Sequence, residues 1–378
     1  MPIELDFVPL IPTFLLMFGG CLLLLSEVFL APGSDRRYQA ALTVGTAAIA
    51  GLVALWQLGT PQSRVIFMGA AIADGFTYFI TVVICGGLLL SALVAQGFLQ
   101  RHSAERGEFY ALLLFASAGM ILLAMSFDLM MLFIALEVMS VATYALAAWL
   151  RRGQRPSESA FKYFLLGAFS SALYLYGVAL VYGATGSTRI ADLAQTTGIA
   201  SLLVPGIALI AVGFAFKVAA VPFHMWAPDV YEGAPTPVTA FMAAGVKAAA
   251  FAAFVRTVAV AFGNSPGQWQ PLVIILAGLT MLVGNLLALP QRNVKRMLAY
   301  SSIAHAGYLL VALAATRFEA AKVSAGGSML FYLAAYTFTA VGAFGTVAAL
   351  ERRESDLATA WDLDRFAGLG KRRPVLAF

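Results

Sequence analysis

The stretch LVPGIALIAVGFAFKVAAVPFHMWAPDVY, residues 203–231, decides the class of fold. It is apolar for longer than one membrane crossing needs, because about 20 helical residues span the hydrocarbon core. Lys217 lies near its middle, and Pro222 follows five residues later. Because proline lacks a backbone donor and clashes with the preceding turn, we expect the helix to break or kink there. The stretch therefore predicts a membrane span with a lysine beside a broken helix.

The composition of the whole chain agrees with a membrane protein. Its 378 residues are 61% hydrophobic and only 11% charged, and the mean hydropathy is +0.85. Soluble domains carry about a quarter charged residues, so this composition excludes a water-soluble enzyme as well as an intrinsically disordered chain. The expected fold class is all-α, a polytopic transmembrane helical bundle.

Apolar runs divide the chain into eleven expected spans, at 8–31, 38–59, 73–98, 109–125, 128–150, 160–183, 203–231, 237–262, 269–289, 295–316 and 325–350. A very tight turn near 126–128 joins the fourth span to the fifth. Apolar residues among charges predict an interfacial helix at 355–370. A basic flank and Pro374 then begin what looks like a twelfth span, so we expect the chain, which ends at Phe378, to be truncated.

The distribution of basic residues predicts the orientation in the membrane. Lysine and arginine gather in the odd-numbered loops, as in Arg36-Arg37 and Arg151-Arg152, and are sparse in the even-numbered ones. By the positive-inside rule the odd loops are cytoplasmic and the N-terminus lies outside. The N-terminal residues lack the features of a signal or transit peptide. We therefore expect a multi-pass protein of the bacterial cytoplasmic (inner) membrane, and an organellar inner membrane is less favoured.

The chain lacks the patterns of a redox or nucleotide-binding protein. Cys21 and Cys85 are far apart in apolar runs, so they cannot hold an iron–sulfur cluster or a structural zinc and look like small core hydrophobes. No strand pattern is present to carry a G-x-G-x-x-G motif. We expect no cofactor or metal site in this chain, and the net charge of +5 reflects topology rather than nucleic-acid binding.

Four ionisable side chains are expected near mid-membrane, where such groups are costly and are functional candidates. They are Glu137, Lys217, Lys247 and His305. A set of Lys, His and Glu without the signature of a substrate-sized polar cavity favours transport of small cations, in particular protons. Transport of a larger substrate stays open on these grounds.

Further candidates lie beside the break and at a span end. His224 sits just past Pro222, and Asp229 and Glu232 follow it. Lys162 lies just inside the cytoplasmic end of the sixth span. These positions suit a proton path that leads from the cytoplasm towards the middle of the membrane.

Each candidate also has a structural interpretation. Lys217 and Lys162 could extend their ammonium groups to an interface. Lys247 could bond a neighbouring carbonyl, and Glu137 could act only as a counter-ion. His305 could be a hydrogen-bonded core histidine.

Other polar residues near span ends are assigned structural roles. Thr236 is expected to cap, and Pro237 to begin, the helix that carries Lys247. Arg256 is interpreted as an interfacial anchor, and Asp74 as a structural residue.

Three stretches resemble a known family. They are VPFHMWAPDVYEGAPTPVTAFM at 221–242, LAYSSIAHAGY at 298–308 and LFIALEVMS at 132–140. They resemble subunit N of proton-pumping NADH:quinone oxidoreductase, respiratory complex I, within the antiporter-like subunit family. The resemblance covers essentially the whole chain, and DVYEGAPTP at 229–237 favours subunit N over its sister subunits M and L.

The resemblance implies fourteen helices, with helices four to eight and nine to thirteen as inverted repeats and helices seven and twelve broken. On this chain it places helices one to three at 1–108, the first repeat at 109–262 and a truncated second repeat at 263–378. It implies that Glu137, Lys217 and Lys247 are the acidic and basic residues of helices five, seven and eight. It places His305 and Lys162 on the polar axis.

The resemblance also implies proton translocation coupled to NADH:quinone electron transfer that other subunits carry out. Those subunits, and not this chain, would bind NADH, FMN, iron–sulfur clusters and quinone. The implied partners are antiporter-like subunit M, small membrane subunits such as K, and lipids, with no nucleic acid. Two alternatives stay open: a subunit of a cation/proton antiporter, and a structural membrane-arm subunit without pumping of its own.

Overall fold

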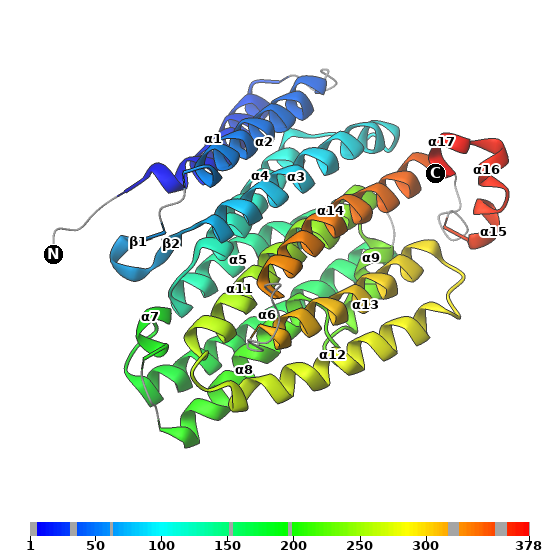
Figure 1. Ribbon diagram of the computed structural model, residues 1–378. Helices are drawn as coiled ribbons and strands as arrows, with labels where there is room; N and C mark the ends of the chain where they lie inside the picture. The colour runs from blue at the N-terminus through cyan, green and yellow to red at the C-terminus, as the bar shows by residue number, and fades with distance from the viewer. Residues whose placement is uncertain are drawn as a thin grey trace.

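The computed structural model describes residues 6–30, 36–60, 63–150, 154–195, 199–316, 325–351 and 361–377. Long helices run side by side through the molecule, with α1 and α2 along one edge and α12 along the opposite edge (Figure 1). Within the described residues, ten helical segments are long and apolar enough to cross a membrane. The predicted all-α, polytopic fold is confirmed.

The elements have these bounds: α1 Ile11–Val28, α2 Arg37–Leu58, β1 Arg64–Ile66, β2 Ala71–Ala73, α3 Gly75–Arg101, α4 Gly107–Met125, α5 Leu129–Ala147, α6 Gln154–Thr185, α7 Ile190–Leu193, α8 Ala200–Lys217, α9 Trp226–Gly233, α10 Thr236–Phe241, α11 Lys247–Val255, α12 Pro266–Ala288, α13 Val294–Ala315, α14 Ala325–Leu350, α15 Leu363–Phe366, α16 Leu369–Arg372 and α17 Pro374–Ala377. Short 3₁₀ turns occupy Val8–Leu10 and Phe67–Gly69.

The seventh expected span is divided, as the sequence predicts. Helix α8 ends at Lys217, five residues before Pro222, and α9 begins at Trp226. The lysine is therefore the last residue of a half-helix, where backbone carbonyls lack partners within the helix.

A left-handed backbone turn and two hydrogen bonds define the break. The backbone of Ala219 adopts a left-handed conformation with φ of 59°. The amide of Val221, which precedes a cis proline, donates to Thr280 Oγ1 of α12 at 2.9 Å. The Trp226 indole donates to the carbonyl of Phe216 at 2.9 Å. The interruption is thus a packed and hydrogen-bonded part of the core.

The eighth span contains two π-helical segments. Met242–Val246 and Arg256–Ala261 are π-helical and lie on either side of α11. Each π turn holds one residue more than an α turn, and such turns often occur at functional sites. The predicted cap is wrong: Thr236 is already helical, and its hydroxyl donates instead to Glu351 Oε2 at 2.7 Å.

The predicted tight turn at 126–128 is confirmed, and it contacts a small hairpin. Asp128 caps α5 by accepting from the amide of Met130 at 2.8 Å. Strands β1 and β2 pair antiparallel, and the amide of Phe127 donates to the carbonyl of Ala70 at 2.7 Å. The expectation of no strand is wrong, because three-residue strands are too short for alternation to show in the sequence.

The described part of the predicted interfacial helix is not one helix. From Trp361 onward the chain forms the short helices α15 and α16, separated by Gly368 with φ of 71°. Residues 355–360 lie outside the described residues. Trp361 packs against Val294 and Val347, so this segment folds back onto α13 and α14.

Two side chains, those of Cys21 and Lys295, occupy environments that differ from the prediction. Cys21 is exposed on α1, whereas Cys85 is buried as expected. Lys295 is the first residue of the expected span at 295–316 and is counted with the basic loop residues that set the orientation, but it is completely buried at the start of α13. Its ammonium donates to the carbonyl of Ala234 at 2.8 Å and lies 4.5 Å from the centre of a Trp361 ring.

Arg256 is not an interfacial anchor, because its side chain is only 5% exposed. Its two terminal nitrogens donate to the two carboxylate oxygens of Asp74, at 3.0 and 3.1 Å, and one also donates to Thr77 Oγ1 at 3.0 Å. The guanidinium carbon lies 5.0 Å from the centre of the Phe76 ring. This ion pair fastens the end of the eighth span to the beginning of α3.

Candidate functional site

Lys217 is held by one face of α5. The lysine is 3% exposed, and its ammonium donates to Ser140 Oγ at 2.8 Å and Tyr144 Oη at 3.2 Å. The nitrogen also lies 5.3 Å from the centre of the Tyr144 ring. A buried ammonium that has exchangeable hydroxyl partners can gain and lose a proton without losing all its hydrogen bonds.

Glu137 lies on the same helix as the two hydroxyl residues, three positions before Ser140. Its carboxylate accepts a hydrogen bond from Ser171 of α6. Among the described residues it forms no ion pair with Lys217 within 4 Å, and the hydrogen-bond partners of that ammonium are Ser140 and Tyr144. The acid therefore lies on the helix that binds the lysine but is held by α6, so its charge acts on the lysine without direct contact.

Lys247 occupies a second buried position, at the start of α11. It is 3% exposed, and its ammonium donates to the carbonyl and to the hydroxyl of Ser302 in α13. The nitrogen lies 5.2 Å from the centre of the Tyr336 ring of α14. The arrangement matches the Lys217 site in chemistry, since each lysine is bound by a serine and an aromatic ring.

His305 adjoins the second lysine site. It follows Ser302 by one turn of α13, is half-buried, and shares a hydrogen bond with the hydroxyl of Tyr332 through Nδ1. Its ring centre lies 5.0 Å from that of Tyr336, the ring that also faces Lys247. The structure thus brings Lys247 and His305 together around one tyrosine.

Aromatic rings fill the space beside the first lysine. Tyr144 meets Tyr163 of α6 edge to face at 4.7 Å, and Tyr163 stacks on Trp226 of α9 at 4.7 Å. Packed rings transmit a displacement of one helix to the next, because interiors have few voids. A continuous series of packed rings therefore joins the Lys217 site to α9.

His224 lies in the break between α8 and α9, half-buried. Its Nδ1 atom is buried and has no hydrogen-bond partner among the described residues. It does not contact Lys217 or Lys247 in any described hydrogen bond or ring interaction, so the structure does not join it to either site.

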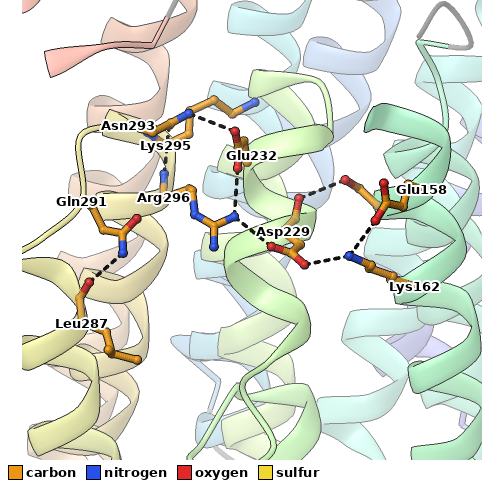
Figure 2. Close-up of polar contacts among 10 residues, drawn as sticks. Glu158, Lys162, Asp229, Glu232, Leu287, Gln291, Asn293, Lys295 and Arg296 are labelled. Carbon is orange, nitrogen blue, oxygen red and sulfur yellow. Dashed lines mark hydrogen bonds and ion pairs between the residues drawn. The ribbon is translucent and has the colours of Figure 1, made fainter. Parts of the chain in front are cut away.

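Lys162 belongs to a separate charged cluster. Its ammonium contacts Glu158 at 2.8 Å and Asp229 at 3.1 Å (Figure 2). The same aspartate also binds Arg296 at 2.8 Å, and Arg296 binds Glu232 at 2.9 Å. Lys162 is 44% exposed and is therefore not part of the buried lysine sites.

Ser140, Tyr144 and Ser302, which bind the two lysines, were not predicted as site residues. Ser140 and Tyr144 follow Glu137 at intervals of three and seven residues, which places all three on one helical face. Ser302 precedes His305 by three residues in the same way. Hydroxyl residues three or seven positions from a charged residue in mid-membrane could have predicted these lysine partners from the sequence.

The described residues contain no group of three or more His, Cys, Asp or Glu side chains placed to hold a metal ion. The polar groups at and beside the two lysine sites are hydroxyls, the two ammonium groups, the Glu137 carboxylate and the His305 imidazole. Hydroxyl, ammonium, carboxylate and imidazole groups can all donate or accept protons.

Residues 126–378 match the family described as NADH:quinone oxidoreductase/Mrp antiporter, TM. A relative from Myxococcus xanthus, named NADH-quinone oxidoreductase subunit N, is 55% identical over 99% of this chain and 77% of its own length. Subunit N 1 of Sorangium cellulosum is 46% identical over 97% and 76%. A chain of Thermus thermophilus respiratory complex I superposes with a TM-score of 0.79 at 36% identity, covering 97% of this chain and 75% of that one.

A chain of the Mrp complex from Dietzia has the same fold, with a TM-score of 0.83 at 22% identity over 98% of this chain and 68% of that one. The helical bundle, the buried lysine at a broken helix and the family match together place the chain in the class of polytopic, antiporter-like membrane subunits. The chain belongs to the NADH:quinone oxidoreductase/Mrp antiporter transmembrane family, and the predicted resemblance to subunit N is confirmed.

Proposed function

We propose that this chain translocates protons across a membrane as the N-type subunit of an NADH:quinone oxidoreductase. The observation that carries the proposal is the buried ammonium of Lys217, which ends a broken helix and is bound only by the hydroxyls of Ser140 and Tyr144 among its described hydrogen-bond partners. Ionisable groups in the interior of a membrane protein mark ion pathways because they are costly to keep there.

In the proposed cycle, Lys217 releases its proton towards Lys247 and His305 when Glu137 moves away or is neutralised. Loss of the nearby negative charge makes the ammonium less stable, which favours release. The Tyr336 ring connects Lys247 with His305, and the hydroxyl of Tyr332 continues the path.

Lys217 then regains a proton from the cytoplasmic side. Lys162 and His224 serve this step in the proposal, because Lys162 is partly exposed and His224 lies in the break with a buried, unbonded nitrogen. Each proton moved against 100 mV requires about 2.3 kcal/mol. Electron transfer in the partner subunits supplies that energy.

The same proposal covers the layout of the chain. Helices one to three occupy 1–108, the first antiporter-like repeat 109–262 and the second 263–378. Its partners are other membrane subunits of the complex, among them subunits M and K, and separate partner subunits bind NADH, FMN, iron–sulfur clusters and quinone. The chain lies in the bacterial inner membrane in contact with lipids, with its N-terminus on the outer side.

The test replaces Lys217 by alanine and, to preserve volume, by methionine in the complete complex. The readouts are the amount of assembled complex, the rate of NADH oxidation and the protons moved per NADH in sealed vesicles. We expect normal assembly and at least an about tenfold fall in proton movement, equivalent to about 1.4 kcal/mol. The exposed Lys371→Ala is the matched control.

Two outcomes would overturn the proposal. Normal pumping by an assembled Lys217 variant would show that this lysine does not carry protons. Sodium-dependent transport by a complex that contains no redox centres would instead indicate a cation/proton antiporter.

A further inference from the structure

One carboxylate bridges two helices at the end of the molecule where α9 ends. Asp229 of α9 lies between Lys162 of α6 and Arg296 of α13 (Figure 2). Its Oδ2 accepts from Lys162 at 3.1 Å, and its Oδ1 accepts from Arg296 at 2.8 Å. The Ser159 hydroxyl also donates to the Asp229 carbonyl at 3.0 Å. Asp229 is therefore tied to α6 by two contacts and to α13 by one.

The outer members of this bridge have second partners. Lys162 also contacts Glu158 at 2.8 Å, and Arg296 also contacts Glu232 at 2.9 Å. Because each cation keeps one partner when it leaves Asp229, the bridge can open on either side without an unpaired charge. Such sharing lowers the cost of exchange between two arrangements.

The α6 side of the bridge leads to the first lysine site. Tyr163, the residue after Lys162, stacks on Trp226 and meets the Tyr144 ring edge to face. Tyr144 in turn hydrogen-bonds the Lys217 ammonium. A shift of α6 relative to α9 would therefore displace a hydroxyl that binds Lys217.

The α13 side leads to the second lysine site. Arg296 lies in the first turn of α13, and Ser302, which binds Lys247, lies six residues further along the same helix. At 1.5 Å per residue this separation is about 9 Å along a rigid rod. A movement of α13 at Arg296 is therefore carried to the Ser302 contact.

We propose that Asp229 is a positioning residue that links the two lysine sites by holding α6 and α13 in register. Without its negative charge, Lys162 and Arg296 would face each other as like charges, and the two helices would no longer move together. This inference rests on the proposed proton-translocating function. It assigns the coupling between the Lys217 and Lys247 sites to the Lys162–Asp229–Arg296 bridge, whose residues are not part of either site.

The test uses Asp229→Asn in the complete complex, which removes the charge and keeps the shape. We expect protons moved per NADH to fall about two- to thirtyfold, the range expected when a residue of a coupling network is changed, with assembly unchanged. Asp229→Glu keeps the negative charge and should move nearly as many protons per NADH as the wild type. Asp364→Asn, at an exposed position on α15, is the matched control and should change nothing.

A double variant separates a shared bridge from two independent contacts. Because Arg296 acts through Asp229 in this scheme, adding Arg296→Met to Asp229→Asn should lower the ratio little further. Fully multiplicative losses would overturn the proposal. A loss of assembled complex with an unchanged ratio per complex would also overturn it, since that result describes a purely structural role.

Lys217→Ala in the same vesicles separates this inference from the proposed function. If Lys217→Ala abolishes pumping while Asp229→Asn pumps normally, only the bridge proposal fails. If Lys217→Ala also pumps normally, both proposals fail.

Discussion

Replacing Arg256 by methionine should destabilise the protein while leaving its apolar volume nearly intact. The substitution removes the guanidinium that binds both oxygens of Asp74 and the hydroxyl of Thr77, in a pair whose side chains are 5% and 21% exposed. It also removes a cation that lies over the Phe76 ring. The carboxylate would remain in place without its counter-ion.

The loss of stability expected for Arg256→Met follows from the burial of the Arg256–Asp74 ion pair. Removing one partner of a buried ion pair costs about 3–5 kcal/mol. Asp74 keeps some solvent and still accepts from the amide of Thr77 at 2.8 Å, so the lower end applies. We expect a loss of about 3 kcal/mol, which for 378 residues lowers the midpoint of thermal unfolding by roughly 4 °C.

The same pair predicts a dependence on pH. Burial raises the pKa of Asp74, but hydrogen bonds and attraction from Arg256 outweigh it, so the net pKa lies below the usual range of aspartate. Because the folded pKa is lowered, the stabilisation is complete at pH values above the unfolded pKa of about 4 and is lost as the pH falls through the folded value. The difference in the midpoint of thermal unfolding between wild type and Arg256→Met should therefore become smaller in acid.

The assay is thermal inactivation of the purified complex in detergent at pH 7 and in acid. Arg64→Met is the matched control, because the Arg64–Asp6 pair has an arginine that is 54% exposed, and it should cost less than about 1 kcal/mol. Adding Asp74→Asn to Arg256→Met should recover part of the loss. Equal midpoints for Arg256→Met and Arg64→Met at pH 7 would refute the reasoning.

Two further predictions concern the lysine site and the helix contacts. Tyr144→Phe removes a hydroxyl that binds the Lys217 ammonium, worth about 1.5 kcal/mol, so proton translocation should slow about tenfold, with the exposed Tyr182→Phe unchanged. Gly284→Ala would place a methyl 2.7 Å from the backbone nitrogen of Ala304 and should cost about 1–3 kcal/mol in thermal inactivation. In Gly278→Ala, on the same helix, the added methyl meets nothing within 4 Å, so this change should be neutral or slightly stabilising. A greater loss of thermal stability in Gly278→Ala than in Gly284→Ala would contradict this packing.

The parts of the fold that depend on local sequence could be predicted. The break after Lys217 follows from a proline within a long apolar run, and the turn at 126–128 follows from two spans that adjoin with almost no residues between them. Such features need only neighbouring residues, so no knowledge of distant contacts is required.

The partners of the charged residues could not be predicted in this way. Ser140 binds a lysine 77 positions later, and Asp74 binds Arg256 across 182 positions. Hydropathy places a residue along a span, but it does not say which helix faces it. For this reason Arg256 near a helix end was taken for an anchor, and Thr236 was assigned a cap when its hydroxyl binds Glu351.

The two π-helical segments on either side of α11 make the eighth span tolerant of a one-residue deletion at some positions and intolerant at others. An α-helix turns by about 100° per residue, so deleting one residue from Lys247–Val255 would rotate everything beyond it to another face. Deleting one residue from Met242–Val246 or Arg256–Ala261 would only tighten a wide turn and would leave the angular phase of the neighbouring segments unchanged. This span can thus shorten by one residue at either side of Lys247–Val255, while the stretch between keeps its phase.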